Sequence, residues 1–177
     1  MKKLMAASML CSLCSLFALG CDDDETTAPS KTLRFESDDV PVGSVVFLRA
    51  ASLSHQQLSL QVVGQELNDV YGLAFRLEYS GQVLSFDAMT AGEGWNGQTT
   101  LPVAREVSAG LLVGAVTQRG DTPGVAVDDA ALAQLELPVS KVAGTEIQFV
   151  EGRSAVVTGD GDEVDAVSFT GGRLVLR

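Results

Sequence analysis

The chain has 177 residues, a formal net charge of −11 at pH 7, 46% hydrophobic residues and only 6% aromatic residues. This length is enough for one domain with a hydrophobic core. The acidity argues against binding to nucleic acid and against electrostatic adhesion to anionic lipid, because both need clustered lysine and arginine.

The first residues have the features of an export signal. Lys2 and Lys3 precede an apolar stretch that ends at Gly20, a pattern typical of a secretory signal peptide and too short for a permanent membrane span. Residues 17–21, FALGC, resemble the lipobox of bacterial lipoproteins. In that family the cysteine sulfur is acylated and the peptide is cut before it. The resemblance implies a signal peptide over residues 1–20 and a lipid on Cys21; the alternative is an ordinary signal peptide with a chance cysteine.

A lipid on Cys21 has consequences for the rest of the chain. Cys11 and Cys14 leave with the signal peptide, so their CxxC spacing builds neither a metal site nor a redox pair. Removing Lys2 and Lys3 changes the net charge from −11 to −13, so the lipid itself is the link to the membrane. The expected location is a bacterial cell envelope, with the domain in the periplasm or at the cell surface. The choice between inner and outer membrane stays open.

Residues 21–31 read as a disordered acidic tether. Asp22-Asp23-Asp24-Glu25 is followed by small polar residues and Pro29, which bury no apolar area. The acidic run lacks a spacing that would fold ligands around an ion, so we expect a solvated segment rather than a calcium site.

From Thr32 onward, apolar residues alternate with polar ones, which predicts β-strands. The clearest strand is Tyr71–Tyr79, in which one face is apolar and the other carries Arg76 and Glu78. The other predicted strands are 45–51, 58–62, 84–90, 102–107, 111–118, 133–139, 146–150, 154–158, 164–169 and 173–176. Asp128 and Asp129 precede a run of alanine and leucine, so one helical turn is expected within 128–135.

Short strands of this kind, separated by glycine-rich turns, predict an all-β fold over residues 32–177. We expect an antiparallel β-sandwich, in which the apolar faces of two sheets meet in one core. Several strands are too short and irregular for a closed barrel.

Residues 58–86 resemble part of the cohesin module, the dockerin-binding domain of cellulosome scaffoldins. The family pattern V-x-G-x-x-F-x-L-x-Y-D-x-x-x-L is matched by Val70, Gly72, Phe75, Leu77, Tyr79 and Leu84, with Ser80 in place of the aspartate. Residues 131–139, ALAQLELPV, and 169–175 resemble two later strands of the module. The resemblance implies a jelly-roll of about nine strands, in a superfamily shared with some carbohydrate-binding modules. It also implies a protein partner that docks on one sheet face, where Arg76 and Glu78 are candidate contacts.

The inventory of reactive residues argues against an enzyme. His55 is the only histidine and lies in a polar link between two predicted strands, where a solvent-facing turn is expected. The chain has no Gly-x-Ser-x-Gly elbow and no phosphate-binding glycine loop. A paired-carboxylate hydrolase needs a cleft with aromatic walls, for which there are too few aromatic residues.

The candidate metal ligands are Asp160, Asp162 and Asp165, whose oxygens suit calcium. The segment misses the EF-hand pattern, and the alternative is an acidic hairpin tip, since Asp-Gly is favoured turn chemistry. The fold is expected to need no cofactor, with calcium as the one candidate ligand.

Trp95, the only tryptophan, lies in a glycine-rich loop beside Asn96. An exposed tryptophan can stack on a sugar or anchor a protein partner, whereas a loop tryptophan that folds back plugs the end of the sandwich. The plug is the favoured interpretation.

The sequence therefore predicts a lipid-anchored envelope protein that binds a protein partner through a cohesin-like module. The alternatives are a carbohydrate-binding module, with Trp95 and Asn96 at the contact, and a purely structural envelope lipoprotein. A row of exposed aromatic residues would favour sugar binding, and an apolar face inside a polar rim would favour a protein partner. The partner and the oligomeric state are not determined by the sequence.

Overall fold

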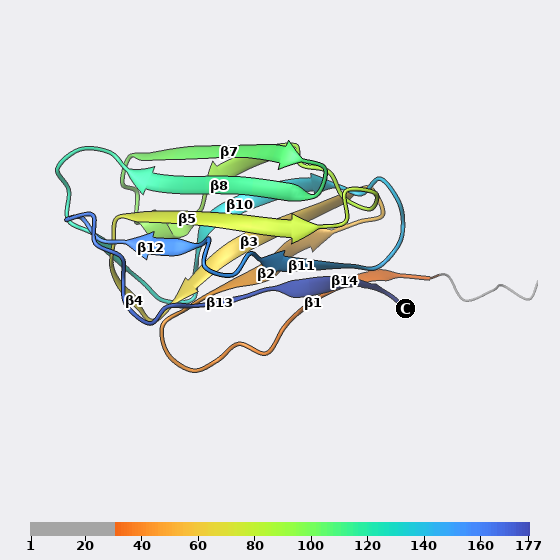
Figure 1. Ribbon diagram of the computed structural model, residues 1–177, viewed down its shortest axis with the longest axis horizontal. Helices are drawn as coiled ribbons and strands as arrows, with labels where there is room; N and C mark the ends of the chain where they lie inside the picture. The colour runs from red at the N-terminus through yellow and green to blue at the C-terminus, as the bar shows by residue number, and fades with distance from the viewer. Residues whose placement is uncertain (1–30) are drawn as a thin grey trace, which may run out of the picture. The chain divides into compact units, whose positions relative to one another are not determined.

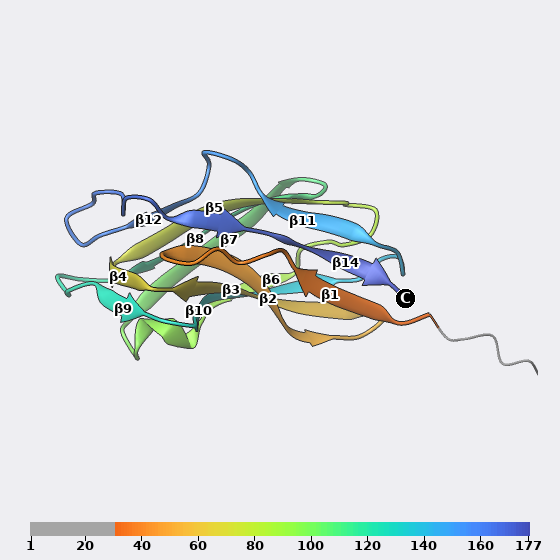
Figure 2. The same cartoon turned by 90° about the horizontal axis from the view of Figure 1, so that it is seen from below.

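Two β-sheets lie face to face in the computed structural model, which describes residues 31–177 (Figures 1 and 2). The first sheet has the strand order β1-β14-β11-β5-β8-β7, and β12 also pairs with β5. Its strands are β1 (Leu33–Ser37), β5 (Gly72–Tyr79), β7 (Thr100–Ser108), β8 (Leu111–Gln118), β11 (Thr145–Phe149), β12 (Ala155–Val157) and β14 (Gly172–Leu176).

The second sheet has the strand order β13-β2-β3-β10-β6. Its strands are β2 (Val45–Leu53), β3 (Gln57–Gln65), β6 (Ala88–Ala91), β10 (Ala130–Pro138) and β13 (Ser168–Thr170). Strand β13 runs parallel to β2, and the other pairs are antiparallel. A small third sheet joins β4 (Leu67–Val70) to β9 (Val125–Val127), and a 3₁₀ turn, η1, spans Glu93–Trp95.

The core lies between the two large sheets, where the alternating strands present their apolar sides. In β5, Leu73, Phe75 and Leu77 are fully buried, while Ala74, Arg76 and Glu78 are exposed. Leu58, Leu60 and Val62 of β3 belong to the same core from the opposite sheet. The fold is therefore an all-β sandwich, as the period of two in the sequence predicts.

The predicted strands agree with the observed ones in place, and β8 has the predicted bounds. Residues 84–90 and 164–169 form strands only over β6 and β13, and Leu84 makes an isolated bridge to Val139. Within residues 31–177 the chain forms fourteen strands, more than the nine or so of the jelly-roll resemblance: each of the eleven predicted segments contains one strand, and β1, β4 and β9 are additional short strands.

The expected helical turn within 128–135 is wrong. Asp129 has a φ of 49°, which stops a right-handed helix, and β10 begins at the next residue. Ala131, Leu132 and Ala133 are fully buried and lie in a strand that pairs with β3. Pairing and burial against the core outweigh the helical preference of alanine and leucine.

Both ends of the described part lie together. The backbone N–H of Thr32 donates to the carbonyl of Arg177 at 2.7 Å, and the N–H of Arg177 donates back to Thr32 at 3.0 Å. Residues 31–177 form one compact unit with its own core. Inside this range no helix has the length and hydropathy needed to cross a bilayer. The signal peptide, Cys21 and almost all of the predicted tether lie outside the described residues.

Candidate functional site

Trp95 is not available as a surface contact. Its side chain is only 2% exposed, and its indole Nε1 donates to the carbonyl of Leu132 at 2.7 Å. The glycines that flank η1 let the loop fold onto β10; a side chain at Gly92 would collide with the Ala131 carbonyl. The loop tryptophan is the plug of the sandwich end, so the contact role suggested for Trp95 is corrected. Asn96 is exposed and ends η1 in the left-handed conformation, with a φ of 49°.

The acidic segment near residue 160 forms a hairpin tip. The N–H of Thr158 donates to the carbonyl of Asp162, and Val157 pairs with Glu163. The side chains of Asp160, Asp162 and Asp165 are exposed. Among residues 31–177, no three histidine, cysteine or acidic side chains are grouped closely enough to hold a metal ion. Calcium binding by these aspartates stays a prediction.

His55 is exposed in the short link between β2 and β3. Ser54 and Gln56 flank it, and the Ser54 hydroxyl accepts hydrogen bonds from the backbone N–H groups of Gln56 and Gln57. The link is therefore a serine-capped turn, as expected from its polar sequence.

Arg76 and Glu78 lie on the outer face of the first sheet. Arg76 of β5 is paired with Val113 of β8, which in turn is paired with Arg105 of β7. Ala74, Ala115 and Val103 form the neighbouring row across the same three strands. The register therefore places one mixed row and one apolar row side by side, with Arg76 and Arg105 at the two ends of the mixed row.

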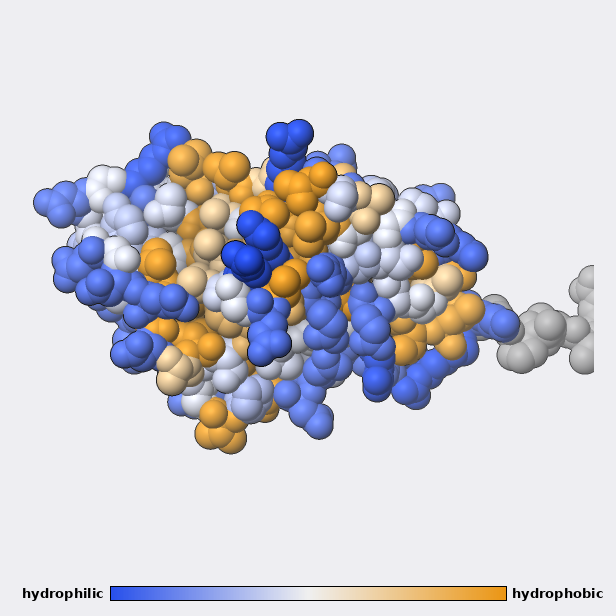
Figure 3. Space-filling model, in the orientation of Figure 1, coloured by the Kyte–Doolittle hydropathy of each residue, from blue (hydrophilic) through white to orange (hydrophobic). Residues whose placement is uncertain are grey.

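Strand β7 adds the exposed apolar residues of this face. Leu101, Val103 and Val107 are 39%, 56% and 52% exposed, and they are half of the large hydrophobic residues that the described part of the chain exposes. We call the following set the apolar patch: Leu101, Val103, Val107, Leu111, Val113 and Ala115. Figure 3 shows hydrophobic surface gathered over β7 and β8, with hydrophilic side chains around it. In the sequence, residues 101–107 indicate this patch, because apolar residues occur on both faces of that one strand.

The outer face of the second sheet carries a polar cluster over β3 and β10, and the separate apolar cluster of Val45, Phe47 and Val63 on β2 and β3 is buried. The Glu136 carboxylate accepts hydrogen bonds from Gln134 at 3.0 Å, Gln57 at 2.9 Å and Ser59 at 2.9 Å. The bond from Gln134, together with those from Gln57 and Ser59, lowers the pKa of Glu136 against the opposing effect of burial. Among residues 31–177, none of the exposed large hydrophobic residues lies on a strand of this sheet.

A partly buried carboxylate holds the β7–β8 hairpin against β5 through two hydrogen bonds. The Tyr79 hydroxyl donates to Glu106 Oε1 at 2.8 Å, and the Gly110 N–H donates to the same oxygen at 2.9 Å. Burial raises the pKa of Tyr79, and the hydrogen bond to Glu106 raises it further. The apolar patch therefore sits on a hairpin that is fixed at its turn.

Comparison with known proteins gives relatives by structure alone. No protein-family model matches the chain, and no curated protein matches it in sequence. Among solved structures, the sixth cohesin of scaffoldin B from Acetivibrio cellulolyticus, in complex with a mutant Cel5 dockerin, matches with a TM-score of 0.59 and 16% identity. The match covers 73% of this chain and 96% of that one.

Two further structures extend the comparison. A type II cohesin domain from the cellulosome of Acetivibrio cellulolyticus matches with a TM-score of 0.59 and 14% identity, over 75% of this chain and 94% of that one. A non-cellulosomal cohesin from the archaeon Archaeoglobus fulgidus matches with a TM-score of 0.53 and 12% identity, over 73% and 87%. At such low identities the structural similarity shows the fold alone: residues 31–177 form a cohesin-like jelly-roll sandwich.

Proposed function

We propose that this protein is a non-catalytic binding protein that docks a protein partner on the apolar patch of its first sheet. The observation behind this proposal is the concentration of exposed apolar side chains on β7 and β8, whereas no exposed large hydrophobic residue within residues 31–177 lies on a strand of the second sheet. Exposed apolar residues inside a polar rim are the usual mark of a protein–protein surface. Arg105 and Arg76 on β7 and β5 supply charged members of that rim.

The fold supports the same role by analogy. Several structures similar to this chain are cohesins solved in complex with a dockerin. Function does not follow from fold, so the docking surface is argued from its own residues. The analogy adds only the class of partner, which is a folded protein module. Trp95 is buried, which leaves the carbohydrate-binding alternative without its proposed aromatic contact.

The partner is expected to cover the face of β7 rather than extend the sheet at its edge. Strand β7 is the edge strand, and Pro102 lies within it, paired with Val116 of β8. A proline on an edge strand removes one N–H from the open side, which interrupts the row of donors that an added strand would need. Binding energy then comes from side chains on the face.

A capture experiment with matched variants tests the docking surface. Immobilised residues 31–177 would be exposed to detergent-solubilised envelope of the producing bacterium, and retained proteins would be quantified by mass spectrometry. Val103→Asp adds a charge in the apolar patch, whereas Thr90→Asp adds it on exposed β6 of the other sheet. We expect a partner that is retained by the unaltered protein and by Thr90→Asp, and lost with Val103→Asp.

The purified partner would then be titrated against all three proteins. Equal binding to Val103→Asp and to the unaltered protein would show that the apolar patch is not the docking surface. A partner that is lost only with Thr90→Asp would move the site to the second sheet.

We also propose that Cys21 carries a lipid that anchors the protein to a bacterial membrane. The support is the lipobox-like sequence FALGC at residues 17–21. Expression in bacteria of the full chain and of Cys21→Ser tests this. The full chain is expected in the detergent phase of a Triton X-114 separation, without residues 1–20 and with added acyl mass. Identical mass and partitioning of the two proteins would contradict the proposal.

A further inference from the structure

The strand beside β5 is interrupted between β11 and β12. Phe149, the last residue of β11, pairs with Leu77, and Ala155, the first residue of β12, pairs with Ala74. Residues 150–154 therefore stand opposite only Phe75 and Arg76. The excess residues leave the sheet as a loop, and insertions of this kind in a ladder are often placed next to functional sites.

The loop is an ordered turn. The N–H of Arg153 donates to the carbonyl of Val150 at 3.1 Å, and Gly152 has a φ of 63°, which suits glycine in the third position of a type II turn. The Ser154 hydroxyl accepts the backbone N–H of Arg76 at 3.3 Å, so the loop is tied back to β5. This geometry fixes Glu151 at the tip of the turn.

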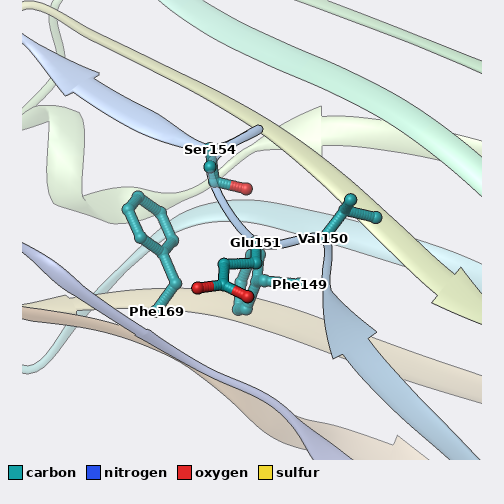
Figure 4. Close-up of a pocket in the computed structure, with 6 residues that line it drawn as sticks. Phe149, Val150, Glu151, Ser154 and Phe169 are labelled. Carbon is teal, nitrogen blue, oxygen red and sulfur yellow. The ribbon is translucent and has the colours of Figure 1, made fainter.

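A hollow of about 220 Å³ opens beneath this turn, between the two large sheets. Its aromatic wall consists of Phe149 from the first sheet and Phe169 from β13 of the second, with ring centroids 5.3 Å apart. Phe149 also contacts Phe75 edge-on in the core, which holds the ring in place. Figure 4 shows Glu151 beside the two rings, with the Ser154 hydroxyl at the rim.

Glu151 is the one carboxylate that lines this hollow, and two more line the hollow beside it. A second hollow of about 330 Å³ shares Gly152, Ser154 and Phe169 with the first and is lined by Glu163 and Asp165. Within residues 31–177, none of the observed ion pairs or side-chain hydrogen bonds engages Glu151, Glu163 or Asp165. Arg153 is the nearest cation in sequence, and it lines neither hollow.

We infer that this pocket, formed by Phe149, Phe169, Glu151 and Ser154, takes an arginine side chain from the docked protein partner. A guanidinium group stacks on aromatic faces and pairs with a carboxylate through its planar fork, and this site presents both elements together. The unpaired carboxylates and the net charge of −11 complement a cation. The inference rests on the proposed function for the source of the arginine, and it adds a recognition element next to β5, the strand that borders the apolar patch.

Small amides test the pocket without the partner. Residues 31–177, labelled with ¹⁵N, would be titrated with N-acetyl-arginine amide and with N-acetyl-citrulline amide, a neutral analogue of the same shape. We expect the arginine amide to shift the backbone signals of Gly152, Ser154 and Phe169, and the citrulline amide to leave them unchanged. In Glu151→Gln the affinity for the arginine amide is expected to fall about fivefold, as for loss of one exposed ion pair.

Glu146→Gln is the matched control, because it removes one charge from β11 at a residue that lies outside the pocket. This variant is expected to bind the arginine amide as the unaltered protein does. Equal shifts with citrulline amide, full affinity in Glu151→Gln, or shifts that map elsewhere would overturn the inference. Failure of the Val103→Asp test would instead affect the docking surface alone, since the amide titration does not use the partner.

Discussion

The carbonyl of Leu132 accepts two hydrogen bonds, one from the Trp95 indole at 2.7 Å and one from the Gly92 N–H at 3.1 Å. The bond from Gly92 continues the β10–β6 pairing by one residue, because Ala133 pairs with Ala91. The same carbonyl of β10 thus holds both the start of the loop and the indole of Trp95.

Two substitutions of Trp95 separate the contribution of ring packing to stability from that of the indole hydrogen bond. Trp95→Ala leaves a large cavity, and we expect it to lower the free energy of unfolding by about 3–5 kcal/mol. Trp95→Phe keeps part of the packing, and the Leu132 carbonyl keeps its bond from Gly92, so the bond itself is expected to account for only about 0.5–1.5 kcal/mol of the loss. Urea denaturation followed by far-UV circular dichroism measures both variants.

The fluorescence of the single tryptophan provides a separate check. A buried indole is expected to emit at shorter wavelength than in the unfolded chain and to resist quenching by iodide. Ready quenching in the native protein would contradict the buried position of Trp95.

Gly114 and Phe75 form a close pair across β8 and β5. A Cβ added at Gly114 would lie 2.4 Å from Phe75 Cζ, and the Phe75 ring is itself only 1% exposed. The ring has no free space to move into, so we expect Gly114→Ala to cost about 1–3 kcal/mol of stability. Thermal denaturation measures the loss.

The neighbouring residue serves as a control for this pair. Ala115→Ser changes a half-buried position on the outer face of β8 and is expected to stay within about 0.5 kcal/mol of the unaltered protein. The double variant Gly114→Ala/Phe75→Leu should recover part of the loss, because the smaller side chain makes room for the methyl group. If the stability losses of the two single substitutions add up fully in the double variant, the two residues do not interact.

The sandwich can be predicted from the sequence because the alternation that specifies each strand is a local pattern. In β8 and β5, alternation specifies both the strand and the buried face, and the observed bounds follow it closely. The plug position of Trp95 also follows from a single observation, a large apolar ring in a glycine-rich loop. Local propensity fails at Ala130–Leu135, where pairing with β3 decides the structure.

The Phe149–Phe169 pocket is beyond reach of the sequence pattern for a different reason. It depends on how β11 and β12 are aligned on β5, and that register is set by contacts between residues far apart in the chain. The apolar patch is intermediate: residues 101–107 carry the signal, but only the pairing with β8 shows which side chains share the outer face.

Ala166 is a strained position in the wall of the second hollow. It has a φ of 57°, in the left-handed region, where a Cβ without a compensating polar side chain costs about 1–2 kcal/mol. Ala166→Gly is therefore expected to raise the free energy of unfolding, less the entropy that glycine adds to the unfolded chain. Chemical denaturation measures the change. A clear loss of stability would mean that the methyl group packs against the wall and outweighs the strain.

Tyr79 is expected to make the stability depend on alkaline pH. Burial, followed by the Glu106 hydrogen bond, raises the pKa of Tyr79 in the folded protein, whereas in the unfolded chain it titrates near the ordinary value of about 10. Below that value both states hold the proton, and the contribution of Tyr79 to stability is complete. Above it the unfolded chain loses the proton first, so stability falls as pH rises.

Comparing the unaltered protein with Tyr79→Phe isolates this effect. Urea denaturation between about pH 8 and about pH 11 should show the advantage of the unaltered protein shrinking above the ordinary tyrosine pKa. Tyr71→Phe, which removes the other tyrosine of the chain, shows how much of any slope comes from tyrosines in general. Parallel pH profiles of Tyr79→Phe and the unaltered protein would mean that the Tyr79–Glu106 bond opens before the phenol ionises, and the turn of the β7–β8 hairpin would then be less firmly held than its geometry indicates.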